Sequence, residues 1–249
     1  PAAGTASDLD PSIVAPTEAV GLHPSPEADK RALLRRLSFD LIGLPPTPRQ
    51  LEEFEADTSP QAYEKVVSRL LAEPQYGERM AMYWLDVVRF SETDGFEYDT
   101  HRRDAWRYRD YVIRAFNNDK PYDRFVMEQL AGDEIAPQED EDLIAAGFNR
   151  LGPLRKNAGN QEVASSRNEV LTEMTNIVGS ALLGVTLGCA RCHDHKFDPF
   201  RQSDYYRVQA YFAAAHDRDV PKFTPEEQAG WKAQAEPVER EMKQLRQAM

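Results

Sequence analysis

Apolar side chains recur at three- and four-residue spacing in one segment after another of this 249-residue chain, and no segment clearly alternates apolar and polar residues. Such spacing is typical of amphipathic helices, whereas a half-buried strand repeats every second residue. It predicts helices over residues 27–41, 48–54, 60–71, 77–90, 102–115, 121–132, 166–187, 203–216 and 224–249. We therefore expect a mainly α fold, an irregular multi-helix domain with long loops.

Capping signals indicate where several of these helices begin. Thr47-Pro48 and Ser59-Pro60 each place a hydroxyl before a proline, which is favoured at the first helical position. Ser166 and Glu169 form a capping-box pattern ahead of a long apolar stripe, which predicts a buried helix running into Gly188. Residues 136–165 are polar and contain glycine, so we expect an irregular segment there. The apolar residues expected to face inward include Tyr63, Leu71, Val87 and Tyr211.

The composition, with 41% apolar and 29% charged residues, is that of an ordinary folded protein. A net charge of −12 opposes binding to a phosphate backbone, so we expect no nucleic-acid partner. No apolar run approaches the roughly 20 residues that span a bilayer, and we expect no transmembrane segment in this sequence.

The chain divides into three parts by composition. Residues 1–26 are rich in proline and small residues and are predicted to form an extended leader or linker. We expect an all-α domain over residues 27–218 and a helical arm over residues 219–249. Apolar residues of the arm step by four and three, as in a heptad seam: Trp231, Ala235, Val238, Met242, Leu245 and Met249. Because the chain starts without an initiator methionine and the seam still runs at its end, we expect a piece of a longer chain, continuing into a helical hairpin or coiled coil.

The segment Gly188-Cys189-Ala190-Arg191-Cys192-His193-Asp194-His195-Lys196 holds both cysteines of the protein and two of its five histidines. Cys-x-x-Cys-His is the pattern that attaches a c-type haem, because two thiols at this spacing can add to the two vinyl groups of the porphyrin. The adjacent histidine, His193, would then be the proximal ligand of the iron. We expect this motif to lie at the end of the buried helix and to bind haem c covalently.

The sequence allows three other interpretations of this motif. The cysteines could form a redox-active disulfide, although no βαβ pattern lies nearby. Zinc could take Cys189, Cys192, His193 and His195, although structural zinc sites draw their ligand pairs from separated segments. The cysteines could also be two buried free thiols. We favour the interpretation that the motif binds haem.

A haem would need further contacts from the rest of the chain. For the second axial ligand we favour His216 among several candidates, the others being His101, Met80, Met82, Met127 and Met174. Arg107 and Arg109 could bind the haem propionates, since arginine pairs well with carboxylates. The alternative is an internal network between these arginines and the acidic segment that precedes them.

Two further polar clusters are candidate sites. The carboxylates Glu92, Asp94, Glu97 and Asp99 lie in one loop and could bind Ca²⁺, although a solvated acidic loop is the favoured reading. Asp194, His195 and Lys196 follow the expected haem ligand directly and could act in catalysis, with His195 as a general acid or base.

Several ordered motifs resemble an uncharacterised domain of planctomycete-type multidomain proteins, the second planctomycete cytochrome-associated type (PSCyt). The resemblance covers about residues 27–215, and these segments carry it: 35–46, 76–79, 105–111, 129–133 and 189–196. It implies a bacterial, exported protein that is periplasmic or secreted. It also implies a neighbouring cytochrome c domain as redox partner and further domains in the same protein. The haem signature of the family maps onto Cys189, Cys192 and His193.

Three functions follow as alternatives. The first is an exported c-type haem domain for electron transfer or redox chemistry, with a link to polysaccharide breakdown suggested by the family context. The second is a haem- or metal-dependent enzyme, an oxidoreductase among others, with His195 and loop 92–99 lining a pocket for an anionic or carbohydrate substrate. The third is a docking module without haem, held by a Cys189–Cys192 disulfide.

Overall fold

The computed structural model describes residues 16, 18–22, 26–95, 99–137, 139–153, 164–216, 220 and 224–248. The prediction of a mainly α fold is confirmed: within these ranges no strand forms, and the only β pairing is an isolated bridge between Thr93 and His101. The chain divides into two compact units, residues 1–213 and 214–249. Most of the predicted leader, residues 1–15 above all, lies outside the described ranges.

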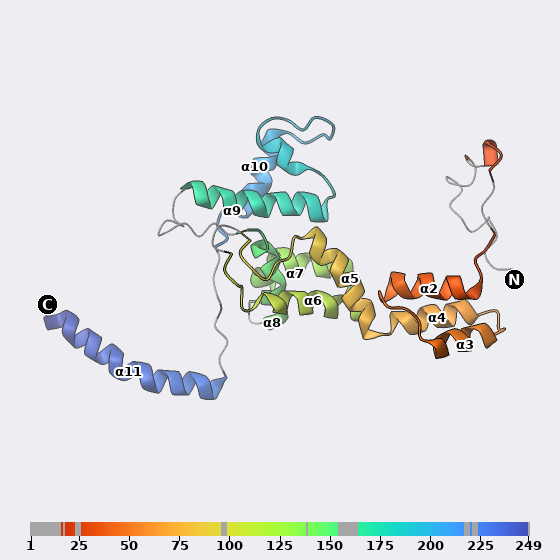
Figure 1. Cartoon of the computed structure of the whole chain (residues 1–249). Coiled ribbons are helices and arrows are strands. Elements are labelled where there is room, and N and C mark those ends of the chain that lie inside the picture. Colours follow the sequence, from red (N-terminus) through yellow and green to blue (C-terminus); the bar gives the residue numbers. More distant parts are fainter. Residues whose placement is uncertain are drawn as a thin grey trace. The chain divides into compact units, whose positions relative to one another are not determined.

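Three short helices open the first unit and share one core, α2 (Lys30–Leu41), α3 (Pro48–Ala56) and α4 (Ala62–Leu71) (Figure 1). Asp29 caps α2 by accepting a hydrogen bond from the Ala32 N–H at 2.8 Å. The capping box predicted before Pro48 is present, and Thr47 and Gln50 satisfy each other's backbone N–H groups. The prediction for Ser59-Pro60 is wrong, because these residues form a turn and α4 begins at Ala62.

The largest core lies between α5 (Pro74–Val87), α6 (Ala105–Asn117), α7 (Tyr122–Ile135) and α8 (Asp140–Ala145). Helix α5 begins at Pro74, three residues before the predicted start, with proline at its first position. Most of the side chains buried in this core are aromatic or aliphatic. They include Tyr108, Tyr111, Val112, Phe125, Ala145 and Phe148. The prediction of an irregular segment over 136–165 is wrong for residues 140–150, which form α8 and the 3₁₀ helix η2 (Ala146–Arg150).

A third group of elements carries the cysteine motif, namely α9 (Ala164–Ile177), the π turn η3 (Val178–Leu182), the 3₁₀ helix η4 (Leu187–Arg191) and α10 (Gln202–Tyr211). Helix α9 begins two residues before Ser166, so this serine does not precede the helix as a cap. The helix also ends ten residues before Leu187, because the backbone widens into η3 and then reverses at Gly184, where φ is +63°. The expectation that the motif lies at the end of a buried helix is therefore wrong, and the motif lies on a separate short helix.

Some apolar residues that the spacing placed inward are solvent-exposed. The exposed fraction is 43% for Tyr63 and Leu71, 50% for Val87 and 87% for Tyr211. Each lies on a helix that buries other positions, such as Leu70 in α4 and Tyr205 in α10. A short helix has room for one buried stripe, so apolar residues beside that stripe stay in solvent.

The second unit contains α11 (Pro225–Ala248), a 24-residue helix. Its apolar residues are at the surface, and Trp231 is 58% exposed. Pro237 lies inside the helix without ending it.

Candidate functional site

The backbone of η4 brings the two cysteines to one side of the chain. Cys189 lies within this 3₁₀ helix and Cys192 follows it with a helical backbone conformation. In a 3₁₀ helix, side chains three residues apart lie above one another. Both thiols are free and exposed, whereas Ala190 between them is completely buried. The motif thus presents two adjacent thiols to one partner and anchors itself through the intervening alanine.

Two glycines let η4 approach the preceding helix closely. A Cβ on Gly179 would lie 2.5 Å from Cβ of Leu187, and a Cβ on Gly188 would lie 2.8 Å from Oδ1 of Asn176. At Gly179 a larger residue would push η4 away, because it would meet the Cβ of Leu187 and the backbone beside it. At Gly188 only the end of the Asn176 side chain would have to move. The position of the cysteines therefore depends on glycine at position 179.

Helix α10 holds the other side of the motif by hydrogen bonds. The backbone N–H of Gln202 donates to Oδ1 of Asp194 at 2.8 Å, and its side-chain Nε2 donates to the carbonyl of Arg191 at 3.0 Å. The Tyr206 hydroxyl donates to the same carbonyl at 3.1 Å. The Asp194 carboxylate thus satisfies a free N–H group at the start of α10, which is the role of a helix cap.

His193 is exposed and has one ring nitrogen engaged. Its Nδ1 lies 2.7 Å from the carbonyl oxygen of Asp194, an acceptor, so Nδ1 carries the proton and donates. In the neutral imidazole, Nε2 is then the nitrogen that has a free lone pair. An Nδ1–H bond to a backbone carbonyl is the arrangement that orients a metal-ligating histidine.

His195 is built into the local structure on both sides of its ring. Nδ1 accepts hydrogen bonds from the backbone N–H groups of Asp198, at 2.8 Å, and Phe197, at 3.3 Å. Because Nδ1 accepts, the proton sits on Nε2, which donates to Oγ1 of Thr186 at 2.8 Å. Only 5% of the side chain is exposed. His195 therefore closes the turn 195–198 and ties it to the residue before η4.

The three residues predicted as catalytic, Asp194, His195 and Lys196, differ in their contacts with the rest of the protein. Asp194 and His195 lie beside His193, but their side chains form hydrogen bonds with the surrounding loop and with α10. Lys196 lies over the ring of Phe197, 5.2 Å from its centroid, and Phe197 is 84% exposed. Their role in catalysis stays a prediction.

The residues of the motif fit a c-type haem. Two adjacent exposed thiols and one histidine with a free Nε2 are the protein groups that such a haem uses. Beside η4, the buried Tyr205 hydroxyl and Asn176 Oδ1 have no hydrogen-bond partner within the described ranges. Over those ranges no group of three or more His, Cys, Asp or Glu side chains is placed to hold a metal ion. Zinc binding at the motif and Ca²⁺ binding at the acidic loop stay predictions.

The acidic loop is tied to the arginines that follow it. Glu92 pairs with Arg109 at 2.9 Å, and the buried Asp94 pairs with Arg102 at 2.9 Å. Arg102 also donates to the carbonyls of residues 150 and 152, which fixes the loop to the end of η2. Asp99 accepts from the Gly95 N–H at 3.1 Å, and Glu97 lies outside the described residues.

The arginines expected to bind the propionates lie on α6 and have protein partners. Arg109 pairs with Asp110 as well as Glu92, and Arg107 pairs with Asp104 at 3.1 Å. The contact between Arg109 and Glu92 is that of the alternative, a network with the preceding acidic segment, whereas Asp104 and Asp110 lie outside that segment. Binding of haem propionates by Arg107 and Arg109 stays a prediction.

The expected second axial ligand, His216, belongs to the second unit, so its pairing with His193 stays a prediction. Among the other candidates, Met174 is buried in α9, Met82 and Met127 are about half-exposed, and His101 forms the bridge with Thr93. The positions of these residues do not identify the second axial ligand.

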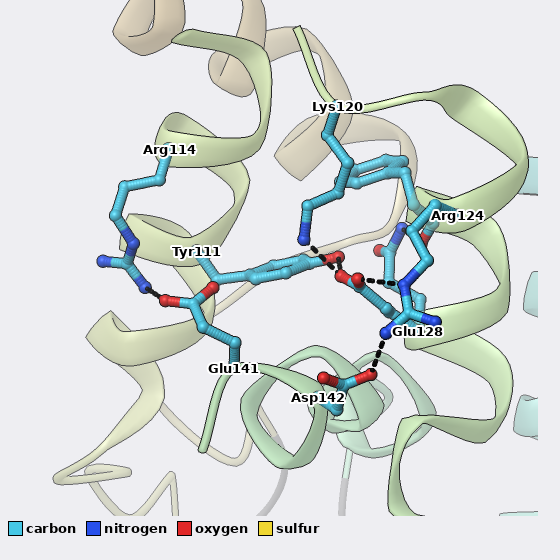
Figure 2. A network of polar contacts seen from close by, with 9 residues as sticks. Tyr111, Arg114, Lys120, Arg124, Glu128, Glu141 and Asp142 are labelled. Carbon is cyan, nitrogen blue, oxygen red and sulfur yellow. Dashed lines mark hydrogen bonds and ion pairs between the residues drawn. The ribbon is translucent and has the colours of Figure 1, made fainter. Parts of the chain in front are cut away.

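A buried polar network that the sequence did not reveal links α6, α7 and α8 (Figure 2). Glu128 is 4% exposed and accepts hydrogen bonds from the Tyr111 hydroxyl at 2.8 Å and from Arg124 Nε at 2.6 Å. Lys120 donates to the same carboxylate, and Arg124 also donates to Asp142 at 2.9 Å. Only Arg124 and Glu128 have the i,i+4 spacing that a helix pattern could indicate.

The environment shifts the pKa values of this network. Burial raises the pKa of Glu128, but the hydrogen bonds from Lys120, Tyr111 and Arg124 outweigh it and leave the pKa below its ordinary value. Burial, and then the bond to Glu128, raise the pKa of Tyr111 well above its ordinary value. The carboxylate is thus charged and the phenol neutral at pH 7. The network therefore has a structural role: its charged hydrogen bonds hold α6, α7 and α8 together.

Comparisons with known proteins identify the family. Neither the curated proteins nor the solved structures contain a significant match to the chain. Over the described ranges, no helix has the length and apolar character needed to cross a membrane. The chain matches the family described as PSCyt2, protein of unknown function (DUF1549), over residues 8–217. Because this match covers most of its 249 residues, the chain belongs to the PSCyt2 family.

Proposed function

We propose that this domain carries a covalently attached haem c and works in electron transfer. Cys189 and Cys192 would form the thioether bonds, and His193 would bind the iron through Nε2. The single observation that carries the proposal is the hydrogen bond from His193 Nδ1 to the Asp194 carbonyl, because it leaves Nε2 as the ligating nitrogen beside two exposed thiols. A bound haem c supplies a one-electron iron couple whose potential depends on its axial ligands.

The protein's contribution is to hold these three residues still. Leu187 and Ala190 are buried against Tyr205, so η4 is fixed by a small apolar core. Asp194 and Gln202 tie the segment to α10, and His195 ties it to Thr186. A rigid support of this kind suits a redox group, since a fixed ligand keeps the potential constant.

Electron transfer is favoured over catalysis by the engagement of the neighbouring polar groups. A general acid or base needs a nitrogen or oxygen within reach of a substrate proton. Both ring nitrogens of His195 make protein hydrogen bonds, and Oδ1 of Asp194 caps α10. The carboxylates of Glu92 and Asp94 are paired with arginines. His195 and Asp194 thus have protein partners, which favours a role in supporting a bound group over a role in proton transfer.

The biological setting is inferred from the family alone. Its cytochrome-associated name supports an extracytoplasmic bacterial protein with several domains and a cytochrome c domain as redox partner. A link to polysaccharide breakdown belongs to the same proposal. We place no substrate in the site.

The coordination state of the iron tests electron transfer against catalysis. The full chain would be exported by a bacterium that has cytochrome c maturation, and its visible spectrum would be recorded with and without cyanide. A six-coordinate spectrum that cyanide leaves unchanged supports electron transfer. A five-coordinate spectrum that shifts with cyanide, together with peroxide turnover, would instead favour the enzyme.

A further inference from the structure

Helix α11 carries an apolar seam whose side chains are exposed among the residues that the structure describes. The exposed fractions are 58% for Trp231, 56% for Val238, 47% for Met242 and 60% for Leu245. These residues and Ala235 are spaced by four, three, four and three positions along one continuous helix. A 3.5-residue repeat of apolar side chains is the pattern of a coiled-coil surface.

The heptad register follows from this spacing. Ala235 and Met242 take a positions, and Trp231, Val238 and Leu245 take d positions. Gly230 and Pro237, the two residues least favourable to a helix, both take c positions, which face away from the seam. The helix breakers are therefore kept out of the contact surface.

The charges beside the seam favour a second copy of the same helix in parallel orientation. In a parallel pair, each g residue meets the e residue of the next heptad of the partner. Glu241 is at g and Arg246 is at e, so Glu241 of one copy meets Arg246 of the other, and the twofold symmetry repeats the pair. Glu227 at g and Lys232 at e form a second attractive pair of this kind. The remaining pair, Gln234 with Glu239, carries one charge only and is not repulsive.

The antiparallel arrangement offers fewer contacts between opposite charges. Antiparallel helices pair a residues with d residues, and e residues then meet e residues while g residues meet g residues. In the register that pairs Ala235 with Val238, Lys232 meets Glu239 of the other copy and Gln234 meets Glu241, which gives two attractive contacts by symmetry. In the register that pairs Ala235 with Leu245, Lys232 meets Arg246, and Glu239 and Glu241 each meet their own copy, which repels. The parallel pair has four attractive contacts, so the charge pattern favours it.

We propose that α11 is a dimerisation helix that forms a parallel two-stranded coiled coil with a second copy of this chain. This would bring two copies of the first unit together, whatever that unit binds. The proposal does not depend on haem attachment, since it rests only on the seam and its flanking charges.

Sedimentation equilibrium of the full chain over a concentration series tests the proposal with three variants. Glu241→Arg should raise the dimer dissociation constant about tenfold, because two attractive pairs become repulsive. The double variant Glu241→Arg with Arg246→Glu restores opposite charges and should recover the wild-type constant. Glu236→Arg makes the same charge change at an outward b position and should leave the constant unchanged.

Each outcome of the sedimentation experiment either supports or overturns the proposed dimer. A wild-type dimer, weakened by Glu241→Arg, rescued by the double variant and unaffected by Glu236→Arg, supports the parallel pair. A wild-type chain that stays monomeric throughout the series, as it would if another segment or protein covered the seam, overturns the proposal. Equal effects of Glu241→Arg and Glu236→Arg, or failure of the rescue, overturn the parallel arrangement. Helicity measured by circular dichroism for each variant ensures that a lost helix is not mistaken for a lost contact.

Discussion

The imidazole of His195 donates from Nε2 to Oγ1 of Thr186 across 2.8 Å, and this bond joins the two ends of the segment that carries both cysteines. Thr186 directly precedes η4, and the opposite nitrogen of the same ring accepts the Asp198 N–H. A single side chain therefore fixes the start of the motif and the turn that follows it. The histidine that looked most like a catalytic group has a structural position.

Replacing His195 should destabilise the motif. His195→Ala leaves the partly buried N–H of Asp198 and the exposed Thr186 hydroxyl without this partner, which costs about 0.5–1.5 kcal/mol of unfolding free energy for each lost hydrogen bond. His195→Asn should recover part of the loss, since an asparagine oxygen can accept the same backbone N–H group but cannot reach Thr186. Urea unfolding measures both variants. Lys196→Ala, at an exposed neighbour, is the control, and an equal loss in this control would contradict the role of His195.

The Glu128 network should make stability depend on pH in the acid range. The folded pKa of Glu128 lies below its ordinary value of 4.5, so its contribution to the unfolding free energy is complete above that pH. This contribution should be lost as the pH falls through the folded pKa. Glu128→Gln should flatten the acid limb of the stability profile. It should also cost about 3–5 kcal/mol at pH 7, as for a broken buried ion pair.

A control for this prediction lies at the surface. Glu141 pairs with Arg114 at 2.5 Å, and both side chains are about half-exposed (Figure 2). Glu141→Gln should change stability at pH 7 by less than about 1 kcal/mol. A pH profile of Glu128→Gln that coincides with that of the wild type would contradict the account of the network.

Gly132 should tolerate no side chain, because α7 and α8 touch at this residue. A Cβ added to Gly132 would lie 2.2 Å from the carbonyl oxygen of Asp142. Gly132→Ala should therefore destabilise the protein by about 1–3 kcal/mol or more, as overpacking of a core does. Gly147→Ala is the matched control, since its Cβ would meet Tyr108 at an ordinary 3.8 Å. Thermal unfolding of the two variants should differ clearly, and equal midpoints would count against the close contact.

His216 can be tested as the second axial ligand by substitution. If it binds the iron opposite His193, His216→Ala should convert a six-coordinate spectrum into one that binds added imidazole. His101→Ala, another of the sequence candidates, should leave the spectrum unchanged. The reverse result would assign the ligand to His101. An unchanged spectrum in both variants would move the search to the methionines.

Local signals predicted much of the fold. The hydroxyl, proline and glutamine at 47–50 determine the start of α3 by short-range hydrogen bonds, which a sequence shows directly. The end of α9 could not be predicted in the same way. Apolar residues continue at helical spacing through Val185, but the backbone leaves the α conformation after Ile177. That change depends on how η3 packs against η4, where Gly179 meets Leu187.

The site shows the same division between local and distant information. The cysteine motif is contiguous, so its spacing alone revealed it. The engagement of His195 depends on Thr186, nine residues away, and the Glu128 network joins residues up to 18 positions apart. Side chains that meet only after folding leave no regular spacing in the sequence, so these contacts could not be predicted from it.

The most direct test of the proposed function is the intact mass of the full chain, exported by a bacterium with cytochrome c maturation, together with its reduced-minus-oxidised spectrum. We expect a mass increased by one haem and a sharp reduced α-band. Both should be absent from the double variant Cys189→Ala with Cys192→Ala and kept in Lys196→Ala. An unmodified mass, or one lower by two hydrogens as in a disulfide, would contradict the haem assignment.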